Sequence, residues 1–111
     1  MALPKENRLT QKRDFDIIFK EGKIIKGNFL FVKYKKSDFC NSRFAFSISI
    51  KIAGNAVTKN KLKRSLSELI RQNIQKIQNN YDVVIVVKKK EKDNILGPEL
   101  LSLLTKTNIL K

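Results

Sequence analysis

Residues 56–71 read AVTKNKLKRSLSELIR, a basic opening followed by an amphipathic helical pattern. Apolar residues recur at spacings of three and four and continue past residue 71, which predicts one long helix over 58–79 with one side on a core. This apolar stripe consists of Leu62, Leu66, Leu69, Ile70, Ile74 and Ile77. The same spacing places on the opposite face Asn60, Arg64, Ser67 and Arg71. The helix is therefore predicted to pack with one side and to offer polar and charged groups with the other.

Positive charge is concentrated at the start of this helix, in Lys59, Lys61, Lys63 and Arg64. Between Asp38 and Glu68 the chain has six basic residues and no acidic one. Cations are unfavourable at a helix N-terminus, whereas its free N–H groups and partial positive charge favour a bound phosphate. The segment therefore predicts a surface for a polyanion, with Asn60 as a hydrogen-bonding group for a base or ribose.

The composition limits the class of protein. With 111 residues and a formal charge of +14, the chain is predicted to form a single domain over 1–111 that associates with nucleic acid or an anionic membrane. It has no histidine, the commonest general base and metal ligand, so no catalytic or metal-binding residue is expected in the protein. The lone Cys40 cannot form an internal disulfide, and the longest apolar run, 83–87, is too short to span a membrane. These features predict a cytoplasmic protein.

The rest of the chain predicts short strands and two further helices. Alternating or unbroken apolar residues predict strands over 24–27, 28–34, 43–51 and 81–87. Helices are predicted over 11–21, ended by Gly22, and from Gly97-Pro98 onward. The resulting order is αβββαβα, an α+β fold.

The strand predicted over 43–51 has two different faces. One face is predicted to join the core and consists of Phe44, Phe46, Ile48 and Ile50. The other face is small, polar and basic and consists of Arg43, Ala45, Ser47, Ser49 and Lys51. This pattern is equally consistent with a sheet surface that contacts a bound ligand and with a sheet face exposed to solvent.

Aromatic residues near the basic segment allow two interpretations. Phe15, Phe19 and Tyr34 could stack unpaired bases beside a basic groove, or they could belong to the core. The pattern alone leaves both open. Phe29, Phe31, Phe44 and Phe46 are better explained as core residues.

The chain resembles the protein subunit of bacterial ribonuclease P in four segments. In order along the chain, these segments are RLTQKRDFDIIFKEGK, FLFVKY, RFAFSISIK and NAVTKNKLKR. The resemblance extends over nearly the whole chain. The signature of that family is an Arg-Asn-Arg segment that opens a long helix before a Lys-Arg pair. Here it stands as Lys59-Asn60-Lys61 and Lys63-Arg64. Lysine keeps the charge of arginine but lacks its planar, bidentate guanidinium.

The resemblance implies a two-layer αβββαβα sandwich with a four-stranded sheet and a left-handed β-α-β crossover through the helix 58–79. It also implies an endoribonuclease that is a ribonucleoprotein. Its catalytic RNA removes the 5′ leader of precursor tRNA with Mg²⁺ held mainly by the RNA, and the protein binds both RNAs. The expected RNA-binding residues are Arg43, Lys51, Lys59, Asn60, Lys61, Lys63, Arg64 and Arg71. The expected leader cleft between the first helix and the sheet is lined by Phe15, Phe19, Tyr34, Ser47 and Ser49.

Other functions use the same basic helix differently. A structural protein of the ribosome or an RNA chaperone would bind RNA without a leader cleft. A DNA-binding helix module would prefer duplex DNA to structured RNA. A stand-alone metal nuclease is disfavoured because the carboxylates are few and scattered.

Overall fold

The computed structural model describes residues 7, 9, 12–36, 42–77, 80–89, 93–107 and 109–110, so Cys40 and the predicted helix end at Asn79 lie outside the described part of the chain. The α-helices are α1 (Lys12–Glu21), α2 (Ile50–Ala53), α3 (Ala56–Gln72) and α4 (Asp93–Lys106). The strands are β1 (Lys23–Lys26), β2 (Leu30–Lys36), β3 (Arg43–Ser47) and β4 (Tyr81–Val87). A 3₁₀ turn, η2 (Ile74–Lys76), follows α3.

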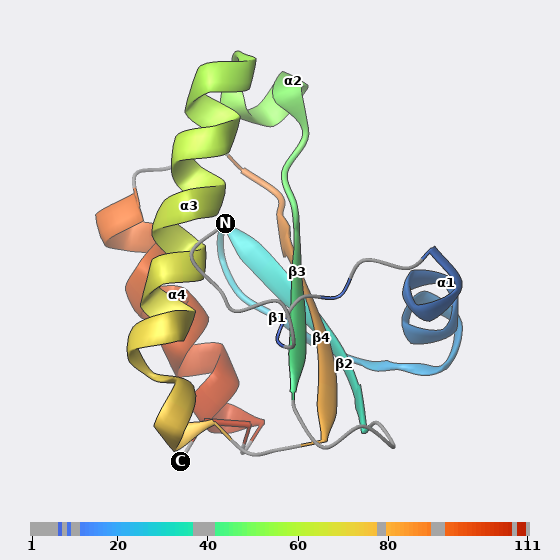
Figure 1. Ribbon diagram of the computed structural model, residues 1–111. Helices are drawn as coiled ribbons and strands as arrows, with labels where there is room; N and C mark the ends of the chain where they lie inside the picture. The colour runs from blue at the N-terminus through green and yellow to red at the C-terminus, as the bar shows by residue number, and fades with distance from the viewer. Residues whose placement is uncertain are drawn as a thin grey trace.

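The strands form one mixed sheet in the order β1-β2-β4-β3, with β3 and β4 parallel and the other pairs antiparallel. Helices α3 and α4 form a layer on one face of the sheet, as the predicted sandwich requires, and α1 lies on the other face (Figure 1). The chain passes from β3 through α3 to β4, and β3 lies in front of β4 in Figure 1. This connection is left-handed, the hand that is rare in β-α-β units.

Two clusters of buried side chains correspond to the two faces. The larger one lies between the sheet and the helices α3 and α4 and includes Leu30, Val32, Phe44, Leu66, Ile70, Ile85, Leu100 and Leu104. The smaller one lies under α1 and consists of Leu9, Ile18, Ala45 and Val84, with Phe15 and Val86 packed against it. The predicted apolar stripe does line the core: five of its six residues are buried in the larger cluster or packed against it, and the sixth, Leu69, is half-buried. Its last two residues, Ile74 and Ile77, lie beyond the end of α3.

The strand that begins at Arg43 is shorter than the predicted range 43–51. It ends at Ser47, and the chain then turns into α2. The backbone carbonyl of Ser49 accepts a hydrogen bond from the Ala53 N–H at 3.0 Å, and its Oγ accepts one from the Ile52 N–H at 3.1 Å. Such local side-chain bonds compete with a strand ladder, and the alternation of residue types does not reveal them.

Helix α3 begins two residues earlier than predicted. Asn55 caps it, because its side-chain oxygen accepts a hydrogen bond from the Thr58 N–H at 2.8 Å. The preceding Gly54 has a φ of 97°, a conformation that glycine adopts without strain. The prediction that the helix continues to residue 79 is wrong, because α3 ends at Gln72, where the Asn73 side chain donates to the Leu69 carbonyl at 2.8 Å, and a 3₁₀ turn follows.

Helix α4 also begins earlier than predicted, at Asp93, so that Pro98 lies inside it. Leu96 is fully buried one turn before Leu100, and this packing extends the helix toward its N-terminus. Glu99 is therefore not a first-turn residue that complements the helix dipole. Its carboxylate instead accepts hydrogen bonds from the backbone N–H groups of Asn28, Phe29 (3.0 Å) and Leu30 (3.1 Å). It fixes the turn between β1 and β2 to α4.

Replacing Glu99 by alanine should lower the free energy of unfolding by about 2–3 kcal/mol, the range for losing a charged acceptor of backbone hydrogen bonds. Urea unfolding followed by circular dichroism measures this change. Glu99→Gln keeps one acceptor oxygen and should recover part of the loss. Glu21→Ala, which removes only an exposed ion pair with Lys35, should cost less than about 1 kcal/mol. Equal losses for Glu99→Ala and Glu21→Ala would contradict this role of Glu99.

Candidate nucleic-acid interface

The start of α3 projects, together with α2, beyond the end of the sheet (Figure 1). The parallel strands β3 and β4 both run toward this end. The turn at Gly54 and the cap at Asn55 fix the direction in which α3 leaves it. The first turns of α3 are thus held rigidly while remaining open to a partner.

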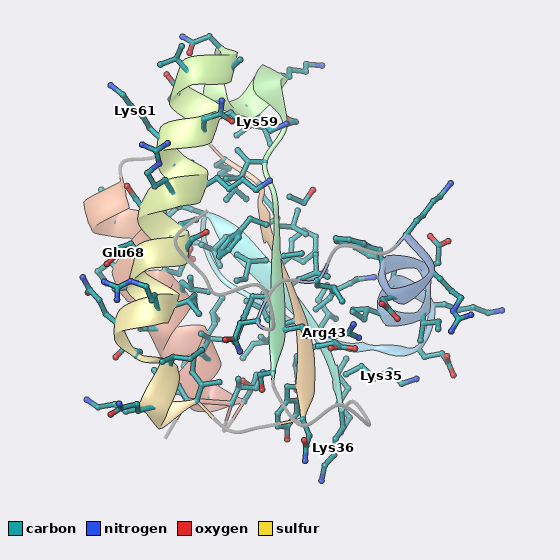
Figure 2. The ribbon with its side chains drawn as sticks, viewed as in Figure 1. Lys35, Lys36, Arg43, Lys59, Lys61 and Glu68 are labelled. Carbon is teal, nitrogen blue, oxygen red and sulfur yellow. The ribbon has the colours of Figure 1, made fainter. Side chains whose placement is uncertain are left out.

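The predicted cations gather at this end. Lys51 on α2 and Asn60, Lys61 and Arg64 on α3 are exposed, and Lys59 and Lys63 are half-buried. Figure 2 shows Lys59 on the side of α3 that faces β3 and Lys61 on the opposite side. At 3.6 residues per turn, positions two apart point in nearly opposite directions, so these residues surround the helix end and do not form one stripe. We call this group of six residues the basic collar.

Two residues expected on the outer face of α3 have other roles. Ser67 is fully buried, because it borders the apolar stripe and lies within the packed side of the helix. Arg71 is exposed but pairs with Glu68 one turn earlier. The hydrogen bonds from Arg71 lower the pKa of the Glu68 carboxyl, and those to Glu68 raise the pKa of Arg71. Because the pKa of Glu68 is lowered, this pair persists below the pH range in which a glutamate ordinarily protonates and is lost as the pH falls through the lowered pKa.

Arg43 was predicted to bind RNA, but its guanidinium is held inside the fold. It pairs with Asp82 of β4 at 2.8 Å and with Asp14 of α1 at 3.3 Å, and the side chains of all three residues are between 12 and 17% exposed. The hydrogen bond to Asp82 is the main cause of the raised pKa of Arg43, and burial opposes it. Arg43 thus fastens α1 to the sheet.

The sheet face beside α1 carries exposed polar and aromatic groups. Ser47 and Ser49 are exposed, as expected for a ligand-facing surface, while Ala45 on β3 is buried under α1. Phe15 is half-buried against the smaller cluster, and the side chain of Phe19 remains 42% exposed. We call Phe15, Phe19, Phe31, Lys33, Ser47 and Val86 the α1-side face.

Lys33 is a site residue that sequence analysis missed. Its ammonium group donates to the Phe19 carbonyl at 3.1 Å and lies 4.7 Å from the centre of the Phe19 ring. A similar contact places Lys88 5.9 Å from the centre of the Phe31 ring. The alternation of β2 could have revealed Lys33, since the buried Val32 next to it must face the other way.

Tyr34 does not join Phe15 and Phe19, contrary to the predicted leader cleft. It packs against the larger cluster on the α3 and α4 side, and its ring lies 6.5 Å from that of Tyr81. Adjacent side chains of a strand point to opposite faces of the sheet. Lys33 faces α1, so Tyr34 faces the side of α3 and α4. Only the register of β2 in the sheet decides which of the two residues meets α1.

Among the described residues, no three Cys, Asp or Glu side chains converge to form a candidate metal site. No helix in that part of the chain is long and apolar enough to cross a bilayer.

Comparisons with known proteins agree with this architecture. A family model described as Ribonuclease P matches residues 3–107. The chain is 40% identical over 89 residues to the ribonuclease P protein component of Fusobacterium nucleatum, covering 80% of this chain and 79% of that protein. The corresponding protein of Thermotoga maritima is 36% identical over 89 residues, covering 80% and 75%.

Solved structures show the same fold. The ribonuclease P protein of Thermotoga maritima superposes with a TM-score of 0.79 at 32% identity, over 89% of this chain and 96% of that one. That of Staphylococcus aureus superposes with a TM-score of 0.85 at 23% identity, over 95% and 98%. The mixed sheet, the left-handed crossover through α3 and the matching sequence together show that this chain belongs to the ribonuclease P protein family, as a protein component of that ribonucleoprotein.

Proposed function

We propose that the basic collar holds the catalytic RNA of ribonuclease P and that the α1-side face binds the unpaired 5′ leader of precursor tRNA. The RNA carries out the Mg²⁺-dependent hydrolysis that releases the leader and forms the mature 5′ end. The protein supplies binding and no catalytic residue. The assembly works in the cytoplasm as an endonuclease.

The basic collar is the observation that carries this proposal. Its five cations lie at one helix end, and no carboxylate occurs between residues 42 and 67 to neutralise them. A helix N-terminus adds its own free N–H groups and partial charge. Phosphates of an RNA backbone can neutralise the cations of this surface. An acidic protein would need carboxylates at the same close spacing to do so.

The α1-side face supports the second half of the proposal. The exposed Phe19 ring offers a stacking surface, and the Lys33 ammonium beside it offers a charge for a phosphate. Base stacking on an aromatic side chain is sequence-tolerant, because every base has a π-face. Such a surface suits leaders of varied sequence.

Magnesium is best assigned to the RNA. The charged groups of the basic collar are all cations, which repel Mg²⁺ and attract the phosphates that bind it. The protein's residues then act by neutralising phosphates, which lets the folded RNA and its substrate approach each other.

Reconstitution tests this function. The protein alone should not cleave a labelled precursor tRNA, and addition of the ribonuclease P RNA of the same organism at low Mg²⁺ should restore release of the leader. Equal cleavage with and without that RNA would refute the proposal. Copurification of ribosomal RNA in place of ribonuclease P RNA would favour the ribosomal or chaperone alternative.

Phe19→Ala should weaken binding of precursor tRNA by about 5-fold or more, since one lost base stack is worth about 1–3 kcal/mol. Mature tRNA lacks the leader and should be bound as before. The two affinities are measured on the assembled ribonucleoprotein. Ile95→Ala removes an equally exposed apolar side chain from α4, on the other side of the sheet, and serves as control.

The stability of Phe19→Ala distinguishes a binding role from a core role. A fully buried phenylalanine costs about 3–5 kcal/mol when truncated, and the exposed Phe19 should cost much less. A loss in that larger range, with equal weakening toward both tRNAs, would assign Phe19 to the core.

A further inference from the structure

A second positively charged site lies at the end of the sheet where β2 ends and β4 begins. A hollow of about 460 Å³ is lined there mainly by Lys23, Lys35, Lys36, Lys106, Tyr34 and Tyr81. We call it the tyrosine–lysine hollow. Lys36 is paired with Tyr81 in the sheet, and β4 runs away from this point toward the basic collar. Figure 2 shows Lys35 and Lys36 at the end of the molecule opposite Lys59 and Lys61.

The charge of the hollow has little internal compensation. Its lysines come from β1, β2 and α4, and among the described residues that line it Glu21 is the one acidic residue. Glu21 lies 3.5 Å from Lys35, in a pair whose side chains are 39 and 57% exposed. Lys23, Lys36 and Lys106 remain as three exposed cations around one concave surface. Like charges so arranged repel one another, and a bound anion relieves that repulsion.

The two tyrosines indicate which anion fits. Their rings are half-buried, 6.5 Å apart and tilted by 55°, so each presents part of its surface to the hollow. A phenol group can donate a hydrogen bond to a phosphate oxygen, and a tyrosine ring can contact a base. Lysines beside aromatic rings are the combination found in sites for single-stranded nucleic acid, whereas duplex binding needs no rings.

We propose that the tyrosine–lysine hollow binds an unpaired segment of the ribonuclease P RNA, as a second contact separate from the basic collar. The inference rests on the proposed function for the identity of that RNA. Two contacts at opposite ends of one rigid domain raise the effective concentration of each other, so both contribute to affinity. They also fix the orientation of the protein on the RNA.

The first test uses the tyrosines as reporters. The chain has two tyrosines, and both line the hollow. In protein labelled with 3-fluorotyrosine, every ¹⁹F resonance therefore reports on this site. A short single-stranded RNA oligonucleotide should shift both resonances in a saturable way, and adenosine monophosphate should not do so at the same concentrations. Unshifted resonances at saturating oligonucleotide, or equal shifts with the mononucleotide, would overturn the inference.

The second test removes the charge. The triple variant Lys23→Gln, Lys36→Gln and Lys106→Gln should reduce the salt slope of binding to the ribonuclease P RNA by about 2, at about 0.7 per phosphate contact. The matched control changes Lys12, Lys20 and Lys76 to glutamine, which removes the same charge from exposed positions outside the hollow. An unchanged slope in the hollow variant, or the same change in the control, would overturn the inference.

Other outcomes separate this inference from the proposed function. If the wild-type protein restores leader cleavage but the hollow variant binds the ribonuclease P RNA normally, the inference fails and the proposed function stands. If the hollow variant weakens only the binding of precursor tRNA by the assembled ribonucleoprotein, the hollow contacts the substrate and the assignment to the ribonuclease P RNA is wrong.

Discussion

Changing Lys59, Lys61 and Arg64 to alanine is expected to weaken binding to the ribonuclease P RNA by about 100-fold. Each exposed cation that meets a phosphate is taken as worth about 1 kcal/mol, below the range for partly buried charged hydrogen bonds. The three side chains surround one helix end, so their loss removes contacts on both sides of α3. Filter binding over a range of salt concentrations measures the effect.

The salt dependence identifies the cause of that loss. The slope of log K against log salt should fall by about 2, because about three phosphate contacts disappear. Changing Lys12, Lys20 and Lys76 to alanine removes the same formal charge from exposed positions elsewhere and should alter the affinity far less. If both triple variants bind equally weakly, net charge and not the basic collar governs the interaction. Circular dichroism checks that α3 remains folded in the variant.

Asp82→Ala should lower the free energy of unfolding by about 3 kcal/mol, at the lower end of the range for breaking a buried ion pair. The variant removes the closer ion-pair partner of the Arg43 guanidinium from a mostly enclosed site, while Asp14 stays at 3.3 Å. Asp14→Ala removes that longer contact alone and should cost about 1 kcal/mol. Urea unfolding measures both changes.

A double variant tests whether the unpaired charge is the cause. Arg43→Met combined with Asp82→Val replaces the two most closely paired groups by apolar ones, an exchange that is often close to neutral, and gives up the longer contact to Asp14. It should recover most of the stability lost in Asp82→Ala. A double variant as unstable as Asp82→Ala would mean that shape at this position, and not charge pairing, holds α1 on the sheet. Hydrogen exchange of α1 should follow the same order among the variants.

Elements with a strong local signal were predicted well. Strand β4 has the predicted bounds, because a mostly apolar segment is limited by Asn80, with a φ of 73°, and by the charged Lys88. Helix α1 and the stripe of α3 followed from spacing alone. Of the bounds that were predicted wrongly, those at Ser47 and Asp93 depend on a serine that caps the next helix and on the burial of Leu96.

The candidate site was predicted less completely than the fold. The residues of the basic collar could be recognised from the sequence alone. An excess of positive charge can be seen without knowing which residues lie close together in the fold. Arg43 and Ser67 were misjudged, since their partners or neighbours come from other elements or from the packed side of α3. Tyr34 and Lys33 are adjacent on β2, and the face on which each lies depends on how β2 pairs in the sheet.

The positive charge at one helix end, the periodic core stripe and the order of the predicted elements could all be read from the amino-acid sequence, because they depend on residues close together in the chain. The tertiary structure alone decided which side chains of β2 meet α1, and which cations are already paired within the fold. Both depend on the register between strands and on the face where α1 packs, and a shift of one residue exchanges every side chain between the two faces.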